Sequence, residues 1–224
     1  MEISAGLRIR NAVDPPMDQG FPVYGSMGGI VYDHNKVPML LTCYHCVHNP
    51  HLKWNHFVID KPNCIVVNEN DQEVGTIVQA IRDETVDIAL IKPVAGATLD
   101  TDIFTFGKIT GARSLTEEEE GNKIALKMHG SVVDHGMGLF TGIAPRTGSY
   151  YEGESSLGKH YLNKLIKVTP IQGVFSMVGD SGSFILDANN EVAGMVVMGG
   201  SDTTYGIPAY RIEKALKITF KKPL

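Results

Sequence analysis

Near its C-terminal end the chain carries the stretch Val178-Gly179-Asp180-Ser181-Gly182-Ser183-Phe184, in which a serine stands in a glycine-bounded loop before an apolar strand. Two earlier stretches have a related character. The first, Leu41-Thr42-Cys43-Tyr44-His45-Cys46-Val47, places a histidine directly after an apolar strand. The second, Val86-Asp87-Ile88-Ala89-Leu90-Ile91, places an aspartate at the mouth of another. Their order along the chain, histidine, aspartate and then serine, carries more information than any one of them.

These three residue types together can build a nucleophile. A serine hydroxyl is a weak nucleophile near neutral pH, so it needs an imidazole within hydrogen-bond reach to take its proton. The imidazole needs a buried acceptor on its other nitrogen, which fixes the tautomer and stabilises the cation. We therefore expect Ser181 as nucleophile, His45 as base and Asp87 as the group that orients the base. The backbone N–H groups of Gly179 and Ser181 are the expected donors to a developing oxyanion.

The rest of the sequence is β-rich. Short runs of β-branched and apolar residues are separated by Gly, Asn, Asp and Pro, with strand starts about 8–12 residues apart, as in sandwiches and barrels. Asp187-Ala188-Asn189-Asn190 has the composition of a hairpin loop. Only residues 208–219 show apolar residues at helical spacing.

A weakly patterned segment from 93 to 122 divides the chain into two halves. We expect one β-unit in residues 1–105, carrying His45 and Asp87. We expect a second unit in residues 106–224, carrying Ser181 and the terminal helix.

On the three stretches quoted above, the sequence resembles the trypsin/chymotrypsin superfamily of serine peptidases, over residues 25–216. The resemblance implies an all-β fold of two antiparallel six-stranded β-barrels, with the site in the cleft between them and a short helix at the C-terminus. The intracellular bacterial-type branch, which includes the plant leaf-shape peptidases, is the most similar. That likeness rests on features such as Gly25-Ser26-Met27-Gly28-Gly29 and Ser201-Asp202…Gly206-Ile207-Pro208.

Two departures from the family are informative. Secreted members pair the cysteine beside the histidine with an upstream cysteine. Here Cys46 has no such partner, and Cys43 is too close in sequence to bridge comfortably. There is also no internal activation sequence near the start, so Asp180 must find another donor than a new N-terminus. Failing that, the oxyanion loop would be ordered only by substrate, a partner or proteolysis, and we therefore hypothesise regulated activity.

The resemblance also implies a substrate pocket. The residue six positions before the nucleophile lies at the pocket base in relatives, and here it is Phe175 rather than an acid. An apolar or small side chain before the scissile bond is therefore expected, and not Lys or Arg. Ser176, Gly199 and Gly206 fall where the pocket walls should be, with Met198 near the substrate backbone. Alternatively, Phe175 packs inward and the floor comes from elsewhere.

A zinc site is the competing interpretation of the histidine stretch. Cys43-x-x-Cys46 has zinc-ligand spacing, and His48, His51 and His56 follow it. However, in an extended strand Cys43 and Cys46 would face opposite sides, and no second ligand pair at finger spacing follows. We therefore expect no metal and no cofactor.

Charge and composition exclude other classes. The chain has 20 basic and 25 acidic residues, a net charge of −5, and no Lys/Arg stripe, so nucleic acid is not an expected partner. No apolar stretch approaches the ~18 residues of a membrane span. Three cysteines are sparse for a secreted protein, and the first thirty residues hold no apolar leader region. We expect a reducing, cytoplasmic location.

The expected function is that of a serine endopeptidase, acting on protein or peptide substrates through an acyl-enzyme. A regulatory protein partner is a further expectation, with the Glu117–Glu120 run and the segment 152–164 as the places where it would dock. A non-catalytic binding module on the same scaffold is the alternative, although such modules usually lose a triad member. An esterase or acyl transferase with the same triad cannot be separated by sequence.

Overall fold

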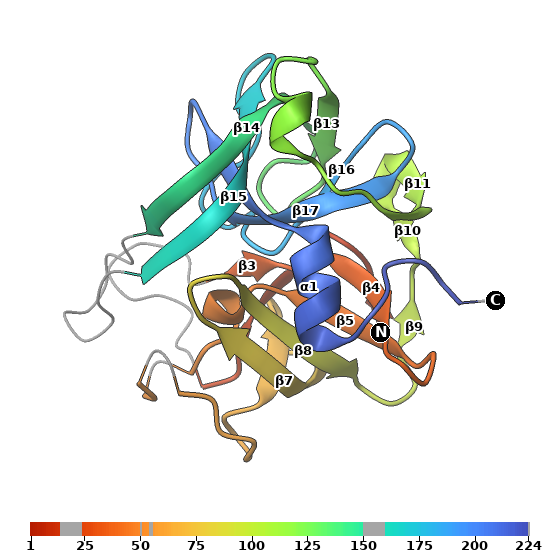
Figure 1. Ribbon diagram of the computed structural model, residues 1–224. Helices are drawn as coiled ribbons and strands as arrows, with labels where there is room; N and C mark the ends of the chain where they lie inside the picture. Colours follow the sequence, from red (N-terminus) through yellow and green to blue (C-terminus); the bar gives the residue numbers. More distant parts are fainter. Residues whose placement is uncertain (14–23, 50, 54–55, 150–159, 224) are drawn as a thin grey trace.

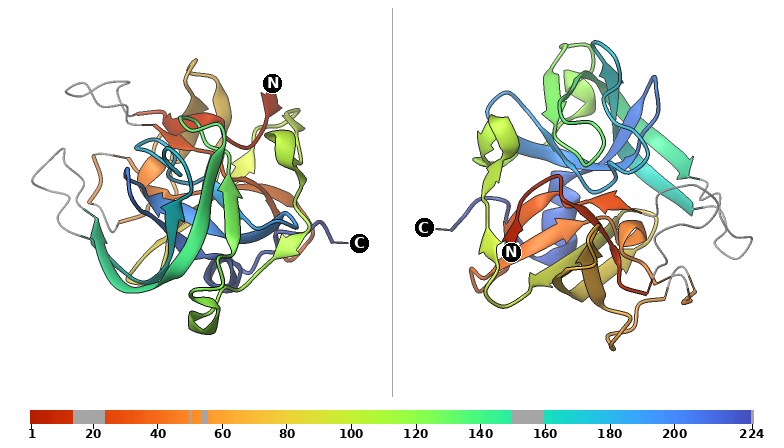
Figure 2. Two further views of the ribbon diagram at one scale, coloured as in Figure 1. Left: turned by 90° about the horizontal axis from the view of Figure 1, so that it is seen from above. Right: turned by 180° about the vertical axis from the view of Figure 1, so that it is seen from behind.

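Strands form where the sequence has apolar and β-branched runs between turn residues, and most of them assemble into two seven-stranded sheets (Figure 1). The structure is a computed structural model that describes residues 1–13, 24–49, 51–53, 56–149 and 160–223. The first sheet lies below the second in Figure 1, and Figure 2 shows the same stacking from behind. The all-β fold of two curled sheets with one short C-terminal helix is therefore confirmed. Each sheet counts seven strands rather than six, because a two-residue strand, β3 or β12, is added at one edge.

The first sheet is antiparallel throughout and has the strand order β3-β2-β6-β7-β8-β5-β4. Its strands are β2 (Arg8–Asn11), β3 (Gly25–Ser26), β4 (Gly29–Tyr32), β5 (Pro38–Thr42), β6 (Ile65–Asn68), β7 (Glu73–Arg82) and β8 (Asp87–Pro93). β5 pairs with β8, with Thr42 opposite Ala89. Because the pair is antiparallel, the last residue of β5 and the first residue of β8 lie at the same end of the two strands. His45 follows shortly after the end of β5, and Asp87 is the first residue of β8.

The second sheet has the order β12-β17-β16-β13-β14-β15-β18, and β18 also pairs with β17, which closes the barrel. Its strands are β12 (Gly111–Ala112), β13 (Ala125–Met128), β14 (Gly136–Ser149), β15 (His160–Pro170), β16 (Phe184–Leu186), β17 (Glu191–Met198) and β18 (Thr204–Pro208). All pairs are antiparallel except β12 with β17. The predicted hairpin loop Asp187–Asn190 is confirmed, since Asp187 Oδ1 accepts from the N–H groups of Asn189 and Glu191.

Several short elements lie outside the two sheets. They are the strands β1 (Glu2–Ile3), β9 (Thr98–Leu99), β10 (Asp102–Ile103) and β11 (Gly107–Lys108), and the 3₁₀ turns η2 (Phe104–Phe106) and η3 (Glu117–Glu119). β1 pairs with β9 in parallel, and β10 pairs with β11 as a tight antiparallel pair. The linking segment that the sequence marks as weakly patterned therefore holds only two-residue strands. The boundary at residues 105/106 stays a prediction.

The predicted helix is shorter than 208–219. Helix α1 spans Ala209–Leu216 and ends at Lys217, whose φ of 55° is left-handed. Its buried residues, Ala209, Ile212 and Leu216, belong to the same hydrophobic cluster as the strands of the first sheet. After the helix, Thr219 exchanges two backbone hydrogen bonds of 2.9 Å with Tyr32 on β4. The C-terminal segment thus packs into a core to which strands of both sheets contribute, and Figure 1 shows α1 in front of the first sheet. Within the described residues, no helix has the length and apolarity needed to cross a membrane.

Glycines let the two sheets approach each other. A Cβ on Gly28 would lie 2.4 Å from the Gly182 carbonyl oxygen and 2.5 Å from Phe184 Cε1. Phe184 is buried and meets the Phe220 ring edge-on at 5.3 Å. The Gly28-Gly29 pair therefore lies against β16 where a side chain would not fit.

We predict that Gly28→Ala destabilises the protein by about 1–3 kcal/mol, because the new methyl group overpacks a contact with backbone that cannot simply rotate away. Urea unfolding measures the change. Gly111→Ala is the matched control, since its Cβ would meet nothing closer than Glu191 Oε1 at 3.7 Å. Equal unfolding midpoints for Gly28→Ala and wild type would refute this packing argument.

Candidate active site

His45 and Asp87 meet where the end of β5 lies beside the start of β8. After β5 the chain turns through η1 (Tyr44–Cys46), which has His45 at its centre. His45 Nδ1 lies 3.1 Å from Asp87 Oδ2, and the His45 backbone N–H donates to Asp87 Oδ1 over 3.0 Å. The structure therefore brings together the predicted base and the predicted orienting group.

Asp87 has no solvent exposure. Burial alone would raise the pKa of the Asp87 carboxyl, but the charge and hydrogen bonds of His45 and the charge of Arg82 hold it below its ordinary value. Arg82 Nε lies 3.8 Å from Asp87 Oδ2. An ionised Asp87 accepts a hydrogen bond from the Nδ1–H group of His45, so the tautomer that leaves Nε2 as the basic nitrogen is the favoured one.

The Ser181 loop is docked on the first sheet. A Cβ on Gly182 would lie 2.2 Å from the Ser26 carbonyl oxygen and 2.4 Å from Thr42 Oγ1, and the φ of +100° at Gly182 also favours glycine. The Ser181 carbonyl oxygen accepts from Ser26 N at 2.8 Å and from Cys46 Sγ at 3.3 Å. Since Cys46 follows His45 directly, this bond places the backbone of the Ser181 loop beside the turn that carries His45.

The Ser181 hydroxyl donates to the Val197 carbonyl oxygen over 3.4 Å, which is long for an O–H···O bond. Giving its proton to His45 requires the hydroxyl to leave this acceptor. Catalytic hydrogen bonds are often long or misaligned without substrate and tighten when it binds.

The predicted oxyanion donors are the backbone N–H groups of Gly179 and Ser181. In the described chain, neither the Gly179 N–H nor the Ser181 N–H donates to another group. The Gly179 carbonyl accepts from Ser26 Oγ and Ser131 Oγ, both at 2.9 Å, which fixes how the loop is oriented. Two backbone donors beside the serine are thus available to a ligand.

Asp180 finds its donors within the same chain. Its Oδ1 accepts from the N–H groups of Val132 (2.8 Å) and Val133 (3.2 Å), and its Oδ2 accepts from Met177 N at 2.8 Å. The side chain is fully buried. Burial raises the pKa of Asp180 above its ordinary value, against the effect of the three amides. The loop is therefore anchored without a new N-terminus, which removes one reason for expecting regulated activity.

Several of these partners carry no recognisable signal in the sequence. Val132, Val133 and Val197 act only through backbone groups that almost every residue has. Ser26 is the exception, because its hydroxyl and its backbone both bind the serine loop. Its place within Gly25-Ser26-Met27-Gly28-Gly29 was the available signal.

The expectation that Cys43 and Cys46 face opposite sides is wrong. Cys43 is extended, but η1 turns the chain immediately after it, and Cys46 N–H donates to the Cys43 carbonyl over 3.2 Å. One ligand atom from each of Cys43, His45 and Cys46 lies within 4.8 Å of the others. His48 is not part of this cluster; it packs edge-on against Tyr44, and burial lowers its pKa to about 4.

The same cluster affects the titration of His45. Burial alone would lower the pKa of His45, but the Cys46 sulfur and Asp87 raise it above the ordinary value. Burial alone would raise the pKa of Cys46, but Cys43 and His45 lower it. Only with Cys46 as a neutral thiol, donating to the Ser181 carbonyl, does a neutral His45 remain able to accept the serine proton.

The predicted pocket residues fall into two groups. Phe175 is fully buried in the second core, where its ring packs against Gly138. Gly206 lies against the same core, because a Cβ on it would lie 2.4 Å from Ile185 Cδ1. The other group is Ser176, Met198 and Gly199, which lie near the end of β17 and the start of β18. Ser176 Oγ is 2.6 Å from Thr204 Oγ1. A Cβ on Gly199 would lie 2.3 Å from Ser176 Oγ, and Met198 packs against the first core. Ser176 and Gly199 therefore touch, and the pocket roles stay predictions.

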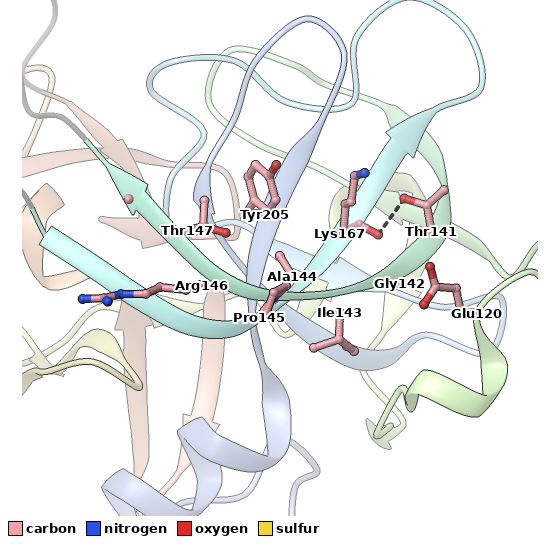
Figure 3. Close-up of a pocket in the computed structure, with 11 residues that line it drawn as sticks. Glu120, Thr141, Gly142, Ile143, Ala144, Pro145, Arg146, Thr147, Lys167 and Tyr205 are labelled. Atoms are coloured by element: carbon pink, nitrogen blue, oxygen red, sulfur yellow. Dashed lines mark hydrogen bonds between the residues drawn. The ribbon is translucent and has the colours of Figure 1, made fainter.

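A separate hollow of about 480 Å³ lies along β14 (Figure 3). It is lined by Glu120, Thr141, Gly142, Ile143, Ala144, Pro145, Arg146, Thr147, Gly148, Lys167 and Tyr205. None of the predicted catalytic or substrate-pocket residues is among them.

The predicted docking places are only partly described. In the acidic run, Glu119 is bound to Arg113 at 2.8 Å, and a capping box with Thr116 orders the turn. Residues 152–159 of the other segment lie outside the described residues. A regulatory partner stays a prediction.

Comparison with known proteins identifies the fold. No protein-family model and no curated protein matches the sequence. Among solved structures, a chymotrypsin of Cellulomonas bogoriensis is 19% identical with a TM-score of 0.62, over 100% of both chains. A Nocardiopsis protease (NAPase) is 15% identical with a TM-score of 0.65, over 99% of this chain and 100% of that one. Thermobifida fusca protease A is 13% identical with a TM-score of 0.65, over 100% of both. The chain thus has the fold of trypsin/chymotrypsin-type serine proteases.

We predict that Asp180→Asn lowers stability by about 1–3 kcal/mol, because its NH₂ group must then face a backbone N–H and leave a buried donor unsatisfied. Loss of this anchor should also slow any reaction of Ser181 that depends on the loop. Urea unfolding and the rate of Ser181 labelling by a fluorophosphonate measure the two effects. Asp134→Asn, at an exposed position, is the control and should change neither. An Asp180→Asn protein that matches wild type in both measurements would count against the anchoring role.

Proposed function

We propose that this protein is a serine endopeptidase that cleaves peptide bonds through Ser181, His45 and Asp87. The observation that carries the proposal is the buried Asp87 bond to His45 Nδ1, formed where the Ser181 loop docks on the first sheet. The fold shared with bacterial serine proteases supports it.

In the proposed reaction, Ser181 Oγ attacks the carbonyl carbon of the scissile peptide bond while His45 Nε2 takes its proton. Asp87 stabilises the imidazolium that forms. The N–H groups of Gly179 and Ser181 donate to the oxyanion, which carries the negative charge of the tetrahedral intermediate. His45 then gives the proton to the leaving amine, and water, activated by the same imidazole, hydrolyses the acyl-enzyme and releases Ser181.

The location and branch are part of the same proposal. Cys43, Cys46 and Cys64 are all free thiols, and buried free thiols fit a reducing compartment. We therefore place the enzyme in the cytoplasm and nearest the intracellular bacterial-type branch. The Gly28-Gly29 contact with Phe184 gives a packing reason for the glycine motif on which that likeness rests.

The contact between Ser176 and Gly199 bears on specificity. By the resemblance these residues fall where the pocket walls should be. A Cβ on Gly199 would lie only 2.3 Å from Ser176 Oγ, so we expect a shallow pocket. Phe175 holds the position that forms the pocket base in relatives and carries no charge, although its ring is buried in the second core. A small side chain before the scissile bond fits this arrangement better than a long or cationic one.

We predict that peptide anilides with Ala or Val before the scissile bond have kcat/KM values at least about tenfold above those with Phe, Lys or Arg, a ratio that one or two methylene groups can produce. A matched substrate series measures this directly. A preference for Lys or Arg would show that the pocket base is not apolar.

The decisive test of the proposal is covalent labelling. A fluorophosphonate should modify the wild-type protein, and Ser181→Ala should abolish the labelling, because the reagent needs an activated serine oxygen. Ser183→Ala is the matched control. Its hydroxyl is buried two residues away and has no hydrogen-bond partner among the described residues, so labelling should persist. Peptide hydrolysis by the same three proteins should follow the labelling. A folded wild-type protein that neither labels nor cleaves would favour the binding module, and labelling without peptide cleavage would favour an esterase.

A further inference from the structure

The turn after β5 gathers two thiols and an imidazole. Cys43 is the residue that precedes η1, and the hydrogen bond from Cys46 N–H to the Cys43 carbonyl closes the turn. One ligand atom from each of Cys43, His45 and Cys46 lies within 4.8 Å of the other two. No disulfide joins the cysteines. The three groups therefore converge on one point beside the proposed nucleophile.

Two thiolates and an imidazole suit a borderline-soft metal ion, and zinc above all. Zinc binds sulfur at about 2.3 Å and nitrogen at about 2.0–2.1 Å, so tetrahedral ligand atoms lie roughly 3.5–3.8 Å apart. The ligand atoms, which lie within 4.8 Å of one another, need to approach by at most about 1.3 Å to reach that spacing. Three protein ligands leave a fourth position for water, as in exchangeable zinc sites.

The surroundings of the cluster suit metal binding. Metal-bound histidines commonly donate their other ring N–H to a carboxylate, and Asp87 already accepts from His45 Nδ1. The Cys43 thiol now donates to the Val196 carbonyl, and the Cys46 thiol to the Ser181 carbonyl. Each carbonyl also accepts a backbone N–H at 2.8 Å, Val196 from Gly182 and Ser181 from Ser26. Losing the thiol protons therefore leaves neither carbonyl unsatisfied.

We propose that Cys43, His45 and Cys46 form a zinc-binding site, and that zinc bound there inhibits the enzyme. As two Zn–S bonds form, the two thiol protons pass to solvent, and the imidazole lone pair is donated to the metal. The base can then no longer take the Ser181 proton. The inhibition rests on the proposed function, whereas zinc binding does not. The ion would enter past His45, whose side chain is about one-tenth exposed, because Cys43 and Cys46 are buried.

Equilibrium dialysis against Zn²⁺ alone tests the binding. Wild-type protein should retain about one zinc ion per chain, and Cys43→Ser and Cys46→Ser should lose it, since serine is a poor zinc ligand. Cys64→Ser is the matched control. Cys64 is equally buried and free, but its thiol donates to Val58 O and lies outside the cluster, so binding should persist. Circular dichroism checks whether each variant is folded. His45→Ala provides a further ligand deletion if a cysteine variant is not.

Co²⁺ substitution identifies the ligands. The wild-type protein should show thiolate-to-cobalt charge-transfer absorption, and the ligand variants should not. Asp87→Asn should weaken zinc binding by about 10–100-fold, the usual effect of losing the partner of a ligating histidine. Retention of zinc by Cys43→Ser and Cys46→Ser at wild-type affinity, or no retention by wild type, would overturn the site.

Labelling by the fluorophosphonate tests the inhibition. Zinc should slow labelling of the wild type and of Cys64→Ser, a chelator should restore it, and Cys46→Ser should label at a rate that zinc does not change. Ser181→Ala should bind zinc as the wild type does. This separates the two proposals: if Ser181 never labels, dialysis still decides the site. Zinc that binds at the cluster without slowing labelling would refute the inhibitory role.

Discussion

A carboxylate without solvent contact, Asp87, is the group on which the geometry of the site depends. An isolated buried charge is too costly to persist, so the Asp87 carboxylate needs hydrogen-bond donors and a positive charge close to it. Asp87 accepts hydrogen bonds from the backbone N–H and the ring Nδ1 of His45, and Arg82 Nε lies 3.8 Å from its Oδ2. Its position is set by the pairing of β5 with β8, and a slip of one residue would turn it to the opposite face. Strand register and site are therefore specified together.

The second half of the molecule reaches the site through hydrogen bonds of its backbone. Ser26 N and Cys46 Sγ hold the Ser181 carbonyl from the first sheet, and amides of the second sheet's own loops hold Asp180. The serine loop is fixed from both sides. Gly179 and Gly182 both have a positive φ, and a Cβ on Gly182 would also strike the Ser26 carbonyl. This explains why the motif is rich in glycine without reference to any relative.

The fold class and the pairing of His45 with Asp87 could be predicted because they depend on side-chain types and on strand periodicity. The hairpin loop Asp187–Asn190 was readable for the same reason, as its aspartate caps the turn. The donors to Asp180 could not be predicted, since they are main-chain amides that carry no signal in the sequence. The arrangement of Cys43 and Cys46 differs from the prediction because the strand alternation ends at Cys43 and the next residues form a 3₁₀ turn. The surroundings of Phe175 depend on tertiary packing that local patterns do not contain.

Residues near the C-terminus lie in a hydrophobic core that strands of both halves share. Ile212, Leu216 and Phe220 pack in this core, and Thr219 exchanges backbone hydrogen bonds with Tyr32 of the first sheet. During synthesis, a ribosome-bound chain that has emerged only as far as the second sheet exposes the apolar surface that these residues cover. Completion of this shared core must therefore wait until the residues up to Phe220 have left the ribosome, and the serine loop has no finished surface on which to dock before then. In a molecule built this way, an incomplete nascent chain lacks an assembled site.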